Sequence, residues 1–371
     1  MLMKKLHASK LTSLAALVAI ALGSTAYATQ YTVTPLEMLG GTSTTVTGIN
    51  STGELVGYVT PSTGNDNAFL YNNGAMTDLN ITGASNSYAT AINSLGQIVV
   101  AEEPGSPGSP YYNYIYNSGS LSEASGPLRS DNINGLNSSG QVVGQTSSAY
   151  AYIYQNGTLQ NIAPYNSSAA AINATGEVVG SYYSNVNNVG TNHAFLYANG
   201  VFQSLFPNTV NSTASGINSS GQVVGYSTDS AGNTYAFLYN NGSVTNLGTL
   251  GGTYSEAYGI NSLGQIVGQS TDSAGNTYGF LYSNGVMQNL NSLIGSASFE
   301  YKLTDPVGIN KNGQIAVNGT ITATGQNMGF LLTPVTSTSS AGVPAPATLG
   351  LLAAAMAGLL LMRRKQIRSL S

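Results

Sequence analysis

Few residues in this 371-residue chain could carry nucleophilic or metal-assisted chemistry. It contains no Cys and two His, His7 and His193, and His7 falls in the leader segment described below. A Ser-His-Asp triad would therefore have to use His193, which we interpret instead as a polar loop residue just before a strand. A single His without Cys also excludes the common zinc sites.

Carboxylates are the other candidates for chemistry, because a pair of them can hydrolyse glycosidic bonds. Glu102 and Glu103 are adjacent, but neighbouring side chains on an extended chain point to opposite faces, so a solvated loop is the better interpretation. Asp229 and Asp272 each begin an Asp-Ser-Ala-Gly-Asn loop that could hold calcium. A calcium site needs about three carboxylates among about six to eight oxygens, so we interpret both loops as tight turns, with weak calcium binding as the alternative. We expect no catalytic residue, cofactor or metal.

An internal repeat supplies the elements that must position these residues. Each copy predicts four short strands: one ending in Ile-Asn, one of the type Gln-Val-Val-Gly, one of the type Ala-Phe-Leu-Tyr, and one after an Asn-Gly turn. About 44 residues with four antiparallel strands are the size of one β-propeller blade. The block that marks each copy, Ile/Leu-Asn-x-x-Gly, contains Asn50, Asn93, Asn137, Asn173, Asn218, Asn261 and Asn310.

The last repeat predicts how such a ring would close. Its third strand, Gly329–Leu332, runs into the C-terminal tail without a fourth strand. The segment Tyr31–Leu39 precedes Gly40-Gly41 as the fourth strand of another repeat precedes Gly251-Gly252. We therefore predict an all-β, seven-bladed propeller closed by its N-terminal strand, which removes exposed sheet edges. Six or eight blades, or an open array, are the alternatives.

The predicted topology also indicates where a ligand would bind. The turns after the first and third strands share one side of the disc and vary little, whereas the other connections share the opposite side and vary. Tyrosine pairs on such loops suit stacking on sugar rings, although ordinary loop packing is the alternative. The residues expected on this ligand face are Glu102, Glu103, Tyr111, Tyr112, Asp131, Tyr182, Tyr183 and His193.

Both ends of the chain predict export. Lys4, Lys5 and Lys10, the apolar run 11–22, and the small residues Ala26 and Ala28 are typical of a signal peptide over residues 1–28, with a permanent anchor as the alternative. The repeat domain would cover residues 29–334, followed by a Ser/Thr-rich linker at 335–342. In residues 343–371, an apolar helix precedes a basic cluster with Arg363 and Arg364 that stays in the cytoplasm, so the body would be left outside the membrane.

Two resemblances extend this interpretation. Residues 343–368, with Pro344, Pro346 and the terminal arginines, resemble the PEP-CTERM sorting signal, although Ala345 stands where that family has Glu. That resemblance implies processing by an exosortase and release to the cell surface or matrix; a simple tail anchor is the alternative. The blocks at 250–253, 259–261 and 279–282 resemble the HAF repeat family of extracellular bacterial proteins, which implies an exported repeat domain without a settled activity.

Charge narrows the choice of partners. Between the two ends lie three basic residues, Arg129, Lys302 and Lys311, and all 14 acidic residues, a net charge of −11. Such a field repels nucleic acid and anionic lipid. We expect the export machinery, an exosortase-like protease, the membrane through the C-terminal helix before processing, and exopolysaccharide or another envelope component as partners. A matrix protein without a specific ligand and a carboxylate-based glycan-cleaving propeller are the alternatives.

Overall fold

The computed structural model describes residues 30–62, 64–79, 81, 86–103, 112–124, 126–129, 131–186, 189–206 and 211–335. The predicted leader residues Ala26 and Ala28, the predicted sorting residues Pro344, Pro346, Arg363 and Arg364, and Tyr111 lie outside these ranges. In the ranges that are described, no helix has both the length and the apolar character needed to span a membrane.

The described part is built almost entirely of strands, as the sequence predicts. Two short 3-10 helices, η1 (Gly126–Arg129) and η2 (Gly295–Phe299), and one α-helical turn, α2 (Leu290–Leu293), are the exceptions among the described residues. The strands are β1 (Tyr31–Pro35), β2 (Gly41–Ile49), β3 (Leu55–Pro61), β4 (Asn67–Asn72), β5 (Ala75–Asp78), β6 (Asn86–Ile92), β7 (Ile98–Glu103), β8 (Tyr112–Asn117), β9 (Ser120–Glu123), β10 (Asn132–Leu136), β11 (Val142–Gln145), β12 (Tyr150–Gln155), β13 (Thr158–Tyr165), β14 (Ser167–Ile172), β15 (Val178–Val186), β16 (Val189–Ala198), β17 (Val201–Ser204), β18 (Ser212–Ile217), β19 (Val223–Thr228), β20 (Thr234–Asn240), β21 (Ser243–Asn246), β22 (Gly251–Ile260), β23 (Ile266–Asp272), β24 (Thr277–Ser283), β25 (Val286–Asn289), β26 (Tyr301–Ile309), β27 (Ile315–Ile321) and β28 (Asn327–Pro334).

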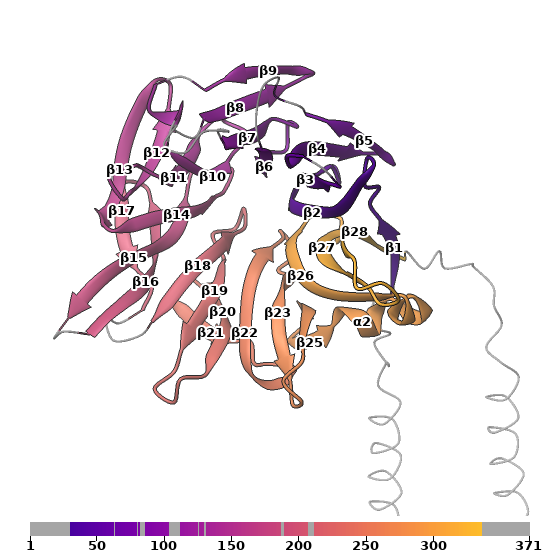
Figure 1. The fold of residues 1–371 in the computed structure, drawn as a ribbon. Coiled ribbons are helices and arrows are strands. Elements are labelled where there is room, and N and C mark those ends of the chain that lie inside the picture. Colours follow the sequence, from indigo (N-terminus) through magenta and orange to yellow (C-terminus); the bar gives the residue numbers. More distant parts are fainter. Residues whose placement is uncertain are drawn as a thin grey trace, which may run out of the picture. The chain divides into compact units, whose positions relative to one another are not determined.

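These strands form antiparallel meanders of four, each covering one sequence repeat. The sheets β2–β5, β6–β9, β10–β13 and β14–β17 follow the chain order. The groups β18–β21 and β22–β25 do the same and are joined into one sheet by a single parallel pairing of Thr234 with Tyr254. The sheets are arranged around a common centre, with the first strand of each group innermost (Figure 1).

The turn between the first two strands of a repeat has the predicted geometry, as Asn218 shows. Its Oδ1 accepts hydrogen bonds from the backbone N–H groups of Ser220 and Gln222, both at 3.0 Å. Gly221 donates its N–H to the Asn218 carbonyl at 3.1 Å and has a φ of +73°. The Asn-Gly turns are also confirmed as hairpin turns, because both central residues have positive φ, +47° at Asn241 and +87° at Gly242.

The same asparagines also join neighbouring sheets, which the sequence did not predict. The Nδ2 of Asn218, only 4% exposed, donates to the carbonyl of Asn261 at 3.0 Å in the next repeat. Corresponding bonds link each of the other asparagines to its successor along the chain: Asn50 to Asn93, Asn93 to Asn137, Asn137 to Asn173, Asn173 to Asn218 and Asn261 to Asn310, all at 3.0–3.2 Å. The repeated Asn therefore shapes its own turn and holds the adjacent sheet.

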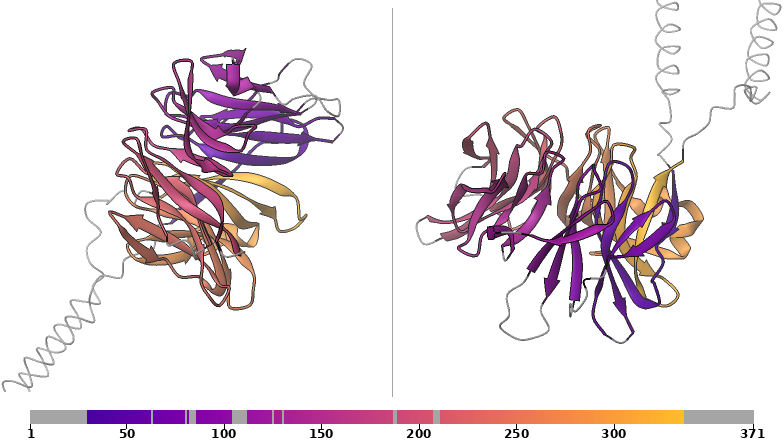
Figure 2. Two further views of the ribbon diagram at one scale, coloured as in Figure 1. Left: turned by 90° about the vertical axis from the view of Figure 1, so that its left-hand side faces the viewer. Right: turned by 90° about the horizontal axis from the view of Figure 1, so that it is seen from above.

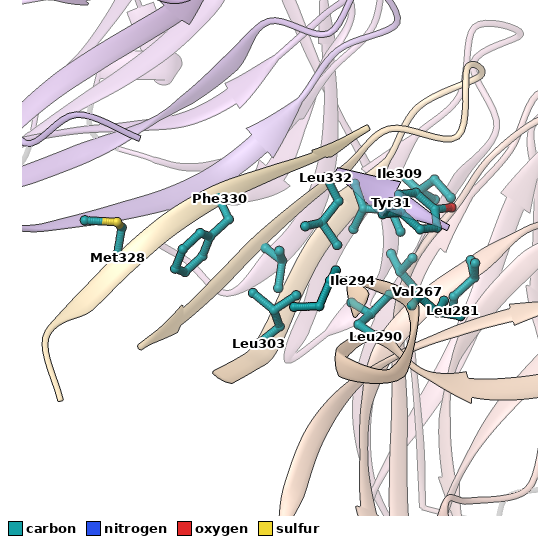
Figure 3. Packing of buried hydrophobic residues seen from close by; sticks show 13 residues of the cluster. Tyr31, Val267, Leu281, Leu290, Ile294, Leu303, Ile309, Met328, Phe330 and Leu332 are labelled. Atoms are coloured by element: carbon teal, nitrogen blue, oxygen red, sulfur yellow. The ribbon is translucent and has the colours of Figure 1, made fainter. Parts of the chain in front are cut away.

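The predicted pairing of the two ends of the repeat domain is confirmed. Strand β1 pairs antiparallel with β28, in a register that places Tyr31 opposite Pro334 and Pro35 opposite Phe330. This gives the fourth strand to the sheet β1-β28-β27-β26. Figure 3 shows Tyr31, which is 4% exposed, in the same buried apolar cluster as Phe330 and Leu332.

A second set of contacts ties this last sheet to the first. Asn318 in β27 donates from Nδ2 to the carbonyl of Val46 at 3.0 Å, and its Oδ1 accepts the Val46 N–H at 2.8 Å. Gln326 donates to the carbonyl of Thr42 at 2.7 Å. In both views of Figure 2 the first and last strands of the described chain lie side by side, in agreement with these bonds between β2 and the last sheet.

Candidate functional site

The two glutamates of the expected ligand face lie in a strand, not in the loop that we predicted. Glu102 and Glu103 end β7, where Glu102 is opposite Ser87 on one side and Tyr112 on the other. Glu103 accepts hydrogen bonds from Asn86 Nδ2 at 2.9 Å and from the Tyr88 hydroxyl at 3.3 Å. The carboxylate of Glu103 therefore helps to join β7 to β6.

His193 also departs from its predicted position. It lies within β16 and is 0% exposed, so it is not a loop residue on an accessible face. Its Nε2 is 2.8 Å from the Ser184 hydroxyl and 3.0 Å from the Thr191 hydroxyl, and its Nδ1 has no hydrogen-bond partner. His193 lies in a strand and not in a loop because the β15–β16 hairpin is long: its pairing continues beyond His193 to Val186 and Val189.

The remaining ligand-face residues separate by exposure. Asp131 is 7% exposed and accepts the backbone N–H of Ser147 at 2.9 Å, so its carboxylate serves a turn. Tyr182 is half-buried, with its ring centroid 5.1 Å from that of His193 and 5.4 Å from that of Phe202. Tyr183, the next residue, is 44% exposed because successive strand side chains point to opposite faces.

The structure does not bring the predicted residues into one site. Glu102 and Tyr112 form a cross-strand pair in the sheet β6–β9, whereas Tyr182 and His193 form one in the sheet β14–β17. The sheet β10–β13 lies between them in chain order. Tyr183 borders an open groove.

The groove beside Tyr183 lies between the sheets β10–β13 and β14–β17. It has a volume of about 360 Å³, and Tyr183 is the one aromatic residue among side chains that are otherwise hydroxyls and amides. An aromatic ring with amide and hydroxyl groups around it can stack on a ring and bond its hydroxyls. The lining residues are Gln145, Asn166, Ser167, Ser168, Ser181, Tyr183 and Asn192.

The position of the Tyr183 ring depends on a glycine across the hairpin. A Cβ atom built on Gly190 in β16 would lie 1.8 Å from the Tyr183 hydroxyl oxygen and 2.6 Å from Cζ. Any other residue at position 190 would therefore displace the phenol. The two residues come from adjoining strands of one hairpin, and the missing Cβ of Gly190 leaves room for the phenol at the edge of the groove.

A further polar cluster, which sequence analysis missed, lies on β22, β23 and β26 of the last two repeats. The Tyr258 hydroxyl donates to Glu256 Oε2 at 3.0 Å, and Gln269 Nε2 donates to the Tyr254 hydroxyl at 3.1 Å. Burial raises the pKa of Tyr254 to about 12, with a further contribution from the hydrogen bond to Glu256. Burial, and next the charge of Glu256, raises the pKa of Tyr258 well above its usual range, so both phenols stay protonated.

A comparison of the repeats with one another could have indicated this cluster. Five residues before the repeated Asn, the sixth and seventh repeats have Glu256 and Asp305, whereas the fifth has Thr213. The charge of Asp305 also raises the pKa of Tyr258, although it lies in a different sheet. Every carboxylate in this group has a hydrogen-bonded neighbour, since Asn318 Nδ2 lies 3.4 Å from Asp305 Oδ2.

The two Asp-Ser-Ala-Gly-Asn loops are tight turns, as predicted. Asp229 Oδ1 accepts the N–H groups of Ala231 and Asn233 at 2.9 Å, and Asp272 makes the equivalent bonds to Ala274 and Asn276. Within the described ranges, no group of three or more His, Cys, Asp or Glu residues is placed to hold a metal ion.

These turns predict a dependence of stability on acid. The pKa of Asp229 is lowered, chiefly by the Asn233 side chain, and that of Asp272 chiefly by the Asn276 backbone N–H. Each pKa is lower in the folded chain, so the stabilisation is present above the unfolded-state pKa and is lost as the pH falls through the folded-state value. We expect the Asp229→Asn, Asp272→Asn double variant to lose less stability on acidification than the wild type, measured by urea unfolding at several pH values. Asp78→Asn, at an exposed strand carboxylate, is the control, and equal acid sensitivity of the double variant would contradict the prediction.

Solved structures with a similar fold are β-propellers. The β-propeller domain of the trilobed protease from Pyrococcus furiosus, described as having an open velcro topology, is 12% identical, with a TM-score of 0.55 over 78% of this chain and 95% of that one. YCF48 bound to D1 peptide is 13% identical, with a TM-score of 0.52 over 85% of this chain and 98% of that one. At such identities the likeness shows the fold alone, so the described sheets form a β-propeller.

Sequence comparison identifies the family. No curated protein sequence matches this chain significantly. The family described as protein of unknown function DUF3466 matches residues 143–345, which is more than half of the chain. The chain therefore belongs to the DUF3466 family.

Proposed function

We propose that this chain is an exported, seven-bladed propeller that serves as a non-catalytic binding scaffold at the cell surface or in the extracellular matrix. Exopolysaccharide is the proposed ligand, and the groove beside Tyr183 is the proposed site. The observation that carries this proposal is the combination of an exposed aromatic ring, for which Gly190 leaves room, with amide and hydroxyl side chains around it.

The chemistry of the groove favours a neutral sugar. No charged side chain is among the described residues that line it, so a ligand would be recognised by hydroxyl and amide hydrogen bonds and by contact with the ring. Asn166 and Asn192 each offer one amide oxygen and two N–H donors, which matches the mixed donor and acceptor character of sugar hydroxyls.

Several observations support a binding role over catalysis. Glu103 is engaged by Asn86 and Tyr88, and His193 is enclosed within its hairpin. A phenol with a raised pKa, as at Tyr258, is a poor nucleophile at neutral pH. A glycan-cleaving propeller using Glu102 and Glu103 remains the catalytic alternative, and a matrix protein without a ligand the structural one.

Export and sorting are proposed from the sequence of the two ends. The proposal includes removal of residues 1–28, transient anchoring in the inner membrane through the C-terminal apolar segment, and processing near Pro344 and Pro346 by an exosortase-like protease. The intact mass of the secreted protein tests all of these together, because both new termini and any attached glycan change it. A mass equal to that of the full chain would refute the processing.

Replacing Tyr183 is expected to weaken polysaccharide binding. Tyr183→Ala removes the aromatic contact. A loss of about 1.4 kcal/mol of binding free energy corresponds to a tenfold larger dissociation constant. Gly190→Ala keeps the tyrosine but displaces its ring, so it should weaken binding as well. The measurement is biolayer interferometry of the purified protein against exopolysaccharide from the producing cells.

The control is Phe299→Ala, which removes an aromatic side chain that is 82% exposed and lies outside the groove. It should bind like the wild type. Wild-type protein that fails to bind the polysaccharide would refute the ligand, and binding that survives both Tyr183→Ala and Gly190→Ala would refute the site.

A further inference from the structure

A cavity on the axis of the ring lies at the opposite end of the strands from Tyr183. It has a volume of about 420 Å³ and is lined by the turns that follow the innermost strands. Each turn contributes three successive residues, an Ile or Leu, the repeated Asn, and the residue after it. Every repeat contributes the same three positions, so the chemical character of the cavity depends on the residues at which the turns differ.

The repeated asparagines line the cavity but are already engaged. Asn173, for example, accepts two N–H groups of its own turn and donates to Glu177 and to the carbonyl of Asn218. The groups left to meet a ligand are therefore those of the next residue in each turn. These residues are Ser51, Ser94, Ser138, Ala174, Ser219, Ser262 and Lys311.

Lys311 is the one charged residue among those that line the cavity, and no carboxylate is among them. The two acidic residues in these turns, Glu54 and Glu177, each accept a hydrogen bond from the Nδ2 of the Asn four residues earlier. The body of the chain carries a net charge of −11. The residues that line the cavity thus carry a positive charge, whereas the body of the chain as a whole is negative.

The floor of the cavity is aliphatic. A second cavity of about 260 Å³ lies further along the axis, and both are lined by the same Ile and Leu side chains, which therefore lie between them. A ligand in the first cavity would meet a hydrocarbon surface, the serine residues of the turns and Lys311. The residues shared by both cavities are Ile49, Ile92, Leu136, Ile172, Ile217, Ile260 and Ile309.

We propose that this axial cavity binds a single carboxylate group, carried by a sugar acid or a short organic acid. The carboxylate pairs with the Lys311 ammonium and accepts hydrogen bonds from serine hydroxyls of neighbouring turns, such as Ser51 and Ser262. The carbon skeleton of the ligand rests on the aliphatic floor. This site is independent of the groove beside Tyr183, so either proposal can fail without the other.

The test is a titration of the purified protein with galacturonate, butyrate and neutral galactose at low ionic strength, followed by methyl NMR of the isoleucines. We expect both acids to shift the methyl signals of the axial isoleucines, and galactose to bind at least tenfold more weakly than galacturonate. Polygalacturonate in a parallel titration distinguishes a sugar acid within a polysaccharide from a free one, because only the former predicts binding of the polymer.

The decisive variant is Lys311→Ser, which gives this turn the residue that Ser51, Ser94, Ser138, Ser219 and Ser262 have at the same position. It should unfold like the wild type and bind galacturonate at least tenfold more weakly. Lys302→Ser removes the same charge at an exposed position outside the cavity and should bind like the wild type. Equal binding of galactose and galacturonate, or unchanged affinity of Lys311→Ser, would overturn the proposal.

Discussion

A chain that begins at Leu36, and so lacks β1, is expected to be less stable than one that begins at residue 29 by at least about 3–5 kcal/mol, the usual cost of removing one large buried aromatic side chain. The deletion removes Tyr31, which is 4% exposed, and the whole ladder between β1 and β28. It also leaves β28, which contains Phe330 and Leu332, as an unpaired edge strand, and such an edge favours aggregation. Urea unfolding followed by circular dichroism measures the loss.

Two substitutions of Tyr31 separate packing from hydrogen bonding in this effect. Tyr31→Ala should cost about 3 kcal/mol, because it empties part of a buried apolar cluster. Tyr31→Phe should be neutral or stabilising by up to about 1 kcal/mol, because the buried hydroxyl has no hydrogen-bond partner. Burial also raises the pKa of this phenol to about 12, as expected for an apolar setting.

The closing role of β1 has a direct rescue experiment. A synthetic peptide covering residues 30–39, added to the shortened chain, should restore part of the lost stability, because the missing strand can pair with β28 in trans. The ring closure is refuted if the shortened chain and the chain that begins at residue 29 unfold at the same urea concentration.

Asn218→Ala is expected to destabilise the protein by about 2–4 kcal/mol, since it leaves the buried carbonyl of Asn261 unpaired at about 1–3 kcal/mol and removes the acceptor of two part-buried turn N–H groups. The N–H groups of Ser220 and Gln222 lose their acceptor, and the carbonyl of Asn261 loses its donor. The change therefore loosens one turn and one connection between sheets together. Urea unfolding again measures the loss, with an unchanged transition slope showing that unfolding stays cooperative.

Asn218→Asp separates these two contributions. Its carboxylate can still accept from Ser220 and Gln222, but it cannot donate to Asn261, so about half of the loss should remain at neutral pH. Asp229 shows that Asp suits this turn, because its Oδ1 makes the same pair of bonds where no neighbouring sheet must be reached. A buried carboxylate facing a carbonyl has a raised pKa, and its protonated form can donate, so the variant should approach wild-type stability as the pH falls. Wild-type stability of Asn218→Asp at neutral pH would show that the bond between sheets contributes nothing.

The candidate site was less accessible to sequence analysis than the fold. Tyr183 was among the expected ligand residues, yet the groove beside it depends on Gln145 in β11 and on Asn166 between β13 and β14. His193 follows the polar residues Thr191 and Asn192, as in a loop, and is buried because the β15–β16 hairpin is longer than the repeat suggests. Asp305 was not predicted beside Tyr258, because their proximity arises between two sheets.

The sequence by itself determined the features that are local to a few residues. Turns that need an Asn acceptor or a Gly at positive φ are specified within about four residues, so their places, and hence the strands between them, follow from the repeat. The pairing of β1 with β28 was also accessible, because one strand was missing at one end of the repeat array and one was left over at the other.

Only the tertiary structure decided which groups meet across sheets. The Asn218 amide finds its acceptor 43 residues away, and the place of Tyr183 depends on a missing Cβ atom on the facing strand. Lys311 is an ordinary surface lysine in the sequence, and it becomes the one charge of an axial cavity because every repeat turns toward the same centre. Distances of this kind are set by how the repeats pack together. They cannot be predicted from the neighbouring residues in the sequence, because the groups that meet are far apart along the chain.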